Sequence, residues 1–117
     1  MIKQSSSFLT KAENGGLEIT LCGDIDHHGA AGLRAEIDGL LYRERPACLY
    51  LNLSAVDFMD SSGLGLILGR YNLMQELGGR MILRRPGRRV ERILHLAGIE
   101  RLIPIEQEQK SVTGGES

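Results

Sequence analysis

Small polar residues gather between positions 57 and 65, where one apolar run ends and another begins. Asp60, Ser61 and Ser62 in this segment are residue types that cap helices, because their side-chain oxygens accept hydrogen bonds from the free N–H groups of a first turn. The positive end of the helix dipole also favours a negative group there. A phosphate on Ser61 would add a charge of about −1.5 to −2 beside Asp60, and a docked partner would have to tolerate it. The segment therefore has the properties of a phosphorylation switch.

Two simpler interpretations compete with the switch. The first is that Asp60 or Ser61 is only an N-cap. Capping sequences are common, so local physics alone favours this interpretation over the switch. The second interpretation is a nucleotide-binding turn made by Gly63, Gly65 and Gly69. It fits poorly, because the spacing is G-x-G-x-x-x-G and the next apolar run ends in basic residues, where a ribose would need an acid.

A second polar cluster consists of Asp24, Asp26, His27 and His28. Carboxylates and imidazoles are metal ligands and acid–base groups. Adjacent histidines point to different sides of a helix, however, and His95 has no partner at a metal-binding spacing. We therefore expect Asp26 to cap a helix and expect no metal site.

Arginine dominates the stretch 80–92, in which Glu91 is the one acidic residue. A solvated face or an acidic protein partner suits this stretch better than nucleic acid, because the chain as a whole is close to neutral. The basic residues are Arg80, Arg84, Arg85, Arg88, Arg89 and Arg92.

Apolar periodicity predicts the elements that position these residues. The strands alternate with helices, which predicts an α/β fold with parallel pairing and right-handed crossovers, and a turn at 14–16 adds an antiparallel hairpin. The loops around Asp26 and Ser61 both follow carboxyl ends of parallel strands, so we expect them side by side. Strands are expected at 8–11, 17–22, 47–53, 80–84 and near 102–103, and helices at 28–42, 61–78 and 90–97.

Composition limits the classes of protein that fit. The chain has 117 residues, and we expect one domain over 1–105 and a polar tail over 106–117. A net charge of −1 and 4% aromatic residues argue against a nucleic-acid partner. Apolar runs are far shorter than the roughly 20 residues that cross a bilayer, and the start lacks a signal-peptide core, so we expect no membrane partner and a cytoplasmic location. Cys22 and Cys48 are expected to be buried apolar side chains.

The segment 57–71, with the sequence D-F-M-D-S-S-G-L-G-L-I-L-G-R-Y, resembles the signature of STAS-domain anti-anti-sigma factors, and most closely their sporulation members. Residues 23–28, with the sequence G-D-I-D-H-H, are similar to a G-E-L-D-H-H segment of that family. The likeness extends over about residues 8–105, although 84–92 is more basic than the family pattern.

The resemblance implies a STAS fold, with a mixed, mostly parallel sheet and helices mainly on one face. It also implies a protein that is not an enzyme and needs no cofactor. An anti-sigma serine kinase of the GHKL ATPase type would bind the unmodified form, release its sigma factor and phosphorylate Ser61, and a PP2C-type phosphatase would remove the phosphate. A STAS module that senses a ligand or nucleotide, or scaffolds a stress complex, is the alternative. The implied partner-binding residues are Asp26, Asp60, Ser61, Ser62, Gly63 and Leu64.

Overall fold

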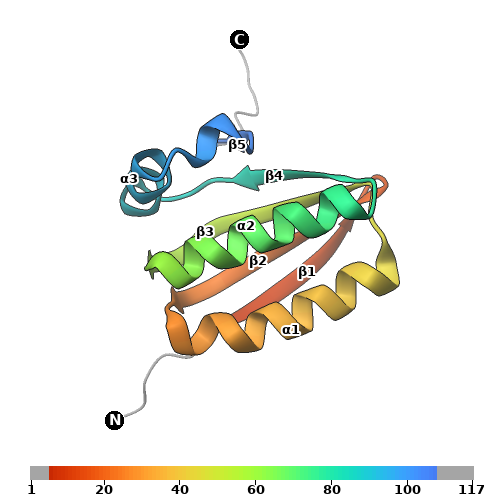
Figure 1. Ribbon diagram of the computed structural model, residues 1–117, viewed down its shortest axis with the longest axis horizontal. Coiled ribbons are helices and arrows are strands. Elements are labelled where there is room, and N and C mark those ends of the chain that lie inside the picture. The colour runs from red at the N-terminus through yellow and green to blue at the C-terminus, as the bar shows by residue number, and fades with distance from the viewer. Residues whose placement is uncertain (1–5, 108–117) are drawn as a thin grey trace.

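The computed structural model describes residues 6–107 and forms one five-stranded sheet with the strand order β1-β2-β3-β4-β5. β1 is antiparallel to β2, and all other neighbours are parallel. Helices α1 and α2 lie side by side over one face of the sheet (Figure 1). The predicted α/β fold is confirmed. Its elements are β1 (Ser7–Glu13), β2 (Gly16–Ile25), α1 (His27–Glu44), β3 (Cys48–Met59), α2 (Ser61–Glu76), β4 (Arg80–Arg84), α3 (Arg88–Leu96), a 3₁₀ turn (Ile99–Arg101) and β5 (Ile105–Glu106).

The core lies between the sheet and the helices because alternate residues of each inner strand point the same way. β3 contributes Leu49, Leu51 and Leu53 to this core, and all three are fully buried. α1 presents Ile37 and Leu41 to them, at the spacing that places residues on one face of a helix. The hairpin between β1 and β2 closes with Asn14 and Gly15 at positive φ, as a two-residue turn requires.

The two strands that lead to the polar loops are longer than predicted. β2 continues from the predicted end at 22 to Ile25, and β3 continues from 53 to Met59. Register shifts interrupt the β2–β3 ladder between Thr20 and Cys22 and again after Gly23. Such bulges break the alternation of apolar and polar residues, so the periodicity of the sequence ends before the strands do.

The last strand was predicted in the wrong place. It lies at Ile105–Glu106 instead of at 102–103, because residues 99–101 form a 3₁₀ turn that buries Ile99 and Ile103 against the core. Glu106, the first residue of the expected tail, thus pairs in the sheet. Residues 108–117 of that tail lie outside the described residues.

Arg84 differs from the solvated arginine that its sequence context predicts. On the face of the sheet away from α1 and α2, its guanidinium contacts Glu13 (2.8 Å), Glu18 (3.2 Å) and Glu106 (2.7 Å). It also lies 3.9 Å from the centre of the Tyr50 ring. Hydrogen bonding to Arg84 lowers the pKa of the Glu13 carboxyl. One side chain therefore links β1, β2, β3 and β5 to β4.

Candidate functional site

The two polar loops meet at the edge of the sheet where β2 and β3 end. Ile25 pairs with Met59 across these strands, so Asp26 and Asp60 leave the sheet next to each other. The backbone N–H of Asp60 donates to the carbonyl oxygen of Ile25 at 3.3 Å. The N-terminal ends of α1 and α2 accordingly lie at one edge (Figure 1), and the expected neighbourhood of the two loops is confirmed.

Both aspartates cap the helix that follows them. The Asp60 carboxylate accepts hydrogen bonds from the N–H groups of Ser62 (2.8 Å) and Gly63 (3.4 Å). The Asp26 carboxylate accepts one from the N–H of Gly29 at 2.9 Å. Capping by Asp26 and Asp60 is thus confirmed, and each helix start already holds one negative charge near its dipole end.

Gly63 lets the first turn of α2 pack against the end of the sheet. An added Cβ at this buried position would lie 2.7 Å from the Cβ of Met59 and 3.1 Å from the carbonyl oxygen of Ile25. Gly65 and Gly69 lie inside the same helix. The glycines therefore form no nucleotide-binding turn, and that interpretation is wrong because the segment is helical from Ser61 onward.

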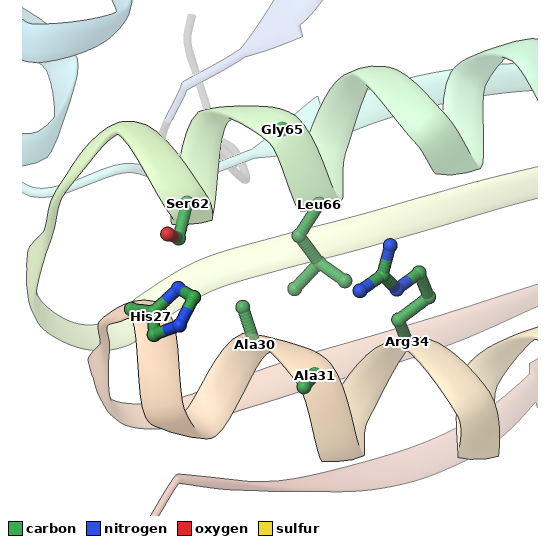
Figure 2. Close-up of a pocket in the computed structure, with 7 residues that line it drawn as sticks. All are labelled: His27, Ala30, Ala31, Arg34, Ser62, Gly65 and Leu66. Carbon is green, nitrogen blue, oxygen red and sulfur yellow. The ribbon is translucent and has the colours of Figure 1, made fainter.

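Ser61 and Ser62 face different surroundings although they are neighbours. Ser61 is the first residue of α2 and is exposed. Ser62 is half-buried and lines a cleft of about 260 Å³ between α1 and α2, with its hydroxyl directed toward His27 (Figure 2). Leu64 is also half-buried and packs against the core. Of the two hydroxyls, the one on Ser61 is therefore open to another protein.

Sequence reasoning missed two features of this edge. Arg34 reaches from α1 into the cleft (Figure 2). The sequence contained a signal for this position, because Arg34 lies four residues after Ala30 and therefore on the same face of the helix. Phe58 is 41% exposed although it is a large apolar side chain, and it lies at the end of β3 just before Asp60. Arg34 thus adds a basic group to the cleft between α1 and α2, and Phe58 adds exposed apolar area near the start of α2.

An ion pair between a buried arginine and a half-buried aspartate connects the two helices. Arg70 of α2, which is 5% exposed, places its Nε 2.8 Å from Asp38 Oδ1 of α1. Its Nη1 also donates to the carbonyl oxygen of Leu66 at 3.3 Å. Burial lowers the pKa of the Arg70 guanidinium, and Asp38 opposes that effect. The contact links the middle of α2 to α1, beside the apolar side chains of α2 that pack in the core.

In the part of the chain that the structure describes, the second polar cluster of the sequence, around Asp26, forms no group with the composition of a metal site. Within residues 6–107, no group of three or more His, Cys, Asp or Glu side chains could hold a metal ion, and His27 and His28 are both exposed. Cys48 is buried as expected, whereas Cys22 is only partly buried. None of the helices in the described range is long and apolar enough to cross a membrane.

The chain is similar in sequence and in structure to known anti-sigma factor antagonists. Residues 8–112 match the STAS domain family. The chain is 38% identical over 91 residues to an anti-sigma F factor antagonist of Paenibacillus polymyxa, which covers 78% of each chain. The unphosphorylated form of the anti-sigma factor antagonist SpoIIAA superposes with a TM-score of 0.73 at 29% identity, covering 87% of this chain and 90% of that one. The phosphorylated form of the Bacillus cell fate determinant SpoIIAA gives 0.67 at 28% identity, covering 87% and 93%.

Proposed function

Because this chain belongs to the STAS domain family, we propose that it is an anti-sigma factor antagonist controlled by phosphorylation of Ser61. The unmodified protein binds an anti-sigma serine kinase of the GHKL ATPase type and so releases a sigma factor for transcription in sporulation or stress. The kinase transfers a phosphate to Ser61 and ends the binding, and a PP2C-type phosphatase restores it. These partners act in the cytoplasm. The single observation that carries the proposal is an exposed serine at the start of a capped helix.

The surroundings of the two serines support Ser61 as the phosphorylated residue. A kinase must bring the serine oxygen in line with the terminal phosphate of ATP, which needs a hydroxyl open to another protein. Ser61 is exposed, whereas Ser62 lies in the cleft between α1 and α2. The protein itself serves as substrate and binding partner and performs no catalysis.

Charge explains how a phosphate at this place would act on the partner and leave the fold unchanged. Asp60 already occupies the N–H groups of Ser62 and Gly63, so the phosphate has no cap to form or to break. It adds about −1.5 to −2 charge next to the carboxylates of Asp60 and Asp26. A partner surface that fits the unmodified edge would then have to accommodate this extra negative charge and desolvate a dianion.

The proposed docking surface is the edge at which α1 and α2 begin. Asp26, Asp60 and Ser61 supply its polar groups, and the exposed ring of Phe58 supplies apolar area. Gly63 and Leu64 contribute differently, because Gly63 is buried and Leu64 is half-buried. These two residues position the start of α2, and Ser62 lines the cleft beside it.

Phosphate mapping tests the proposal. The cognate kinase is recovered by pull-down from the native cell, and the purified protein is incubated with it and ATP. Mass spectrometry should find one phosphate on Ser61. Ser61→Ala should gain none and still bind the kinase, Ser61→Asp should bind more weakly, and the matched control Ser62→Ala should be phosphorylated like the wild type. A phosphate on another residue contradicts the assignment.

The cleft beside Ser62 favours a second candidate, a module that senses a small ligand. His27 and Arg34 could hold an anionic group there. Its volume of about 260 Å³ lies below the roughly 300–1,000 Å³ typical of ligand pockets, so a partner side chain fits it better than a metabolite. Native mass spectrometry after gentle purification separates the two, because a retained ligand would favour the sensor.

A further inference from the structure

Helix α3 carries basic side chains that the fold does not use. Val90 and Leu94 hold the helix on the core, and both are buried. Arg88, Arg89 and Arg92 are exposed. In the described part of the chain none of these three forms an ion pair or a side-chain hydrogen bond with another residue. We call them the α3 arginine surface.

The acidic groups near this surface are already engaged. Glu91 accepts a hydrogen bond from the Gln107 side chain at 2.9 Å, and Glu100 contacts the His95 ring at 2.6 Å. Seven arginines stand against these two glutamates between residues 80 and 101, while the whole chain has a net charge of −1. Positive charge is therefore concentrated at α3, and the remainder of the chain is acidic.

The α3 arginine surface is open and lies at the same end of the sheet as the start of α2 (Figure 1). A shallow hollow of about 580 Å³ is lined by the arginines together with Glu91 and His95. α3 follows the carboxyl end of β4, just as α2 follows that of β3, and α3 also packs against β3. Figure 1 shows α3 at the same end of the sheet as the start of α2. A protein that docks at Ser61 can therefore extend to the α3 arginine surface.

We propose that the α3 arginine surface is a second contact of the anti-sigma kinase and binds an acidic surface of that partner. This inference rests on the proposed function, because it assigns a further docking element to the same interface. Exposed charges of this kind act mainly on the association rate, since they steer the partner before close contact forms.

A protein partner fits the charge distribution better than nucleic acid does. Duplex DNA carries its charge over many base pairs, so the acidic remainder of this chain would repel the flanking phosphates. The exposed side chains of α3 include no Phe, Tyr or Trp ring on which a base could stack, and the imidazole of His95 already contacts Glu100. A localised acidic surface meets the arginines without that repulsion.

Association kinetics test the inference with the full-length chain and the recovered kinase. The charge reversal R88E/R92E alters two arginines one helical turn apart, and R43E/R80E is a matched control with the same charge change at exposed positions outside α3. At about 0.05 M salt the association rate of R88E/R92E should fall about tenfold, with a weaker salt dependence than the wild type. The control should stay within about twofold of the wild type. Thermal unfolding verifies that both variants are folded.

The outcomes separate this inference from the proposed function. If Ser61→Asp weakens binding while R88E/R92E associates like the wild type, the inference is wrong and the proposed function stands. An equal loss in both reversal variants would mean that only net charge matters, and it also overturns the inference. Binding of a duplex DNA or of phosphatidylserine vesicles that depends on Arg88 and Arg92, with unchanged kinase association, assigns the surface to another partner. No kinase binding by the wild type refutes both proposals.

Discussion

Gly63 shows how one residue fixes the place of the proposed switch. The space for a Cβ is occupied by Met59 and by the carbonyl oxygen of Ile25. Gly63→Ala should therefore push the start of α2 away from the sheet and lower the free energy of unfolding by about 1–3 kcal/mol. Kinase binding should weaken as well, because Ser61 lies two residues earlier in the same turn.

Gly69 supplies the matched control. It lies in the middle of the same helix, and nothing stands within 4 Å of its added Cβ. Gly69→Ala should raise the free energy of unfolding by up to about 1 kcal/mol, because alanine is the better helix former. Urea denaturation of both variants measures the difference. Equal effects at the two glycines would contradict the packing of α2 described above.

Local and distant contacts differed in how well the sequence predicted them. The caps at Asp26 and Asp60 followed from the sequence, because a cap needs only the residue and the turn that follows it. The role of Arg84 did not follow, since its partners Glu13 and Glu18 are 71 and 66 positions away. Only the sheet order brings these side chains together.

At the scale of elements, the Arg84 contacts connect strands that differ widely in sequence position. Arg84→Met keeps an unbranched apolar stem but removes the guanidinium and its charge between Glu13, Glu18 and Glu106. We expect the free energy of unfolding to fall by about 2 kcal/mol at neutral pH, because the partly buried carboxylates lose their hydrogen-bond donor and repel one another. Urea denaturation of the two proteins measures the loss.

The pH dependence of this variant is a separate prediction. The pKa of Glu13 is lowered in the folded protein, so its contribution is present above the pKa of the unfolded chain, 4.5, and is lost as pH falls through the lower folded value. Wild-type stability should therefore fall below about pH 4.5. This loss of stability at low pH should be smaller in Arg84→Met, because protonation of the glutamates relieves the repulsion between them in that variant. If the free energy of unfolding depended on pH in the same way in both proteins, the role given to Arg84 would be contradicted.

The ion pair between α1 and α2 should respond differently to single and double changes. Asp38→Ala leaves the Arg70 guanidinium buried without its carboxylate and should destabilise the protein by about 3 kcal/mol. The double variant Asp38→Ala/Arg70→Met removes both charges and should lose less than the single variant. A double-mutant cycle in urea measures this. If the free-energy changes of the two single variants simply added up in the double variant, the packing of the helices would not depend on the ion pair.

Periodicity predicted the elements where it was regular. The strand at 80–84 has the predicted bounds, and the ends of α1 lie within two residues of the prediction. β2 and β3 were underestimated because bulges interrupt their ladder. These strand ends carry the loops of the candidate site, so sequence reasoning was least accurate where the site begins.

At the scale of the whole molecule, parallel strands bring separate segments to one edge. The loop after β2, the start of α2 and the start of α3 all follow carboxyl ends of strands. The sequence predicted the meeting of Asp26 with the Ser61 loop from this rule. It did not predict that the α3 arginine surface shares the edge, because local basic composition says nothing about which end of a sheet a helix occupies.

The central claim is that a phosphate on Ser61 blocks docking without changing the fold. Calorimetric titration of the anti-sigma kinase with the unmodified and the Ser61-phosphorylated protein tests it directly. Phosphorylation should weaken binding by at least about 100-fold, equivalent to about 2.7 kcal/mol, while the unfolding midpoint in urea stays the same. Equal affinity of the two forms, or a phosphorylated form that has lost its folded structure, would contradict the claim.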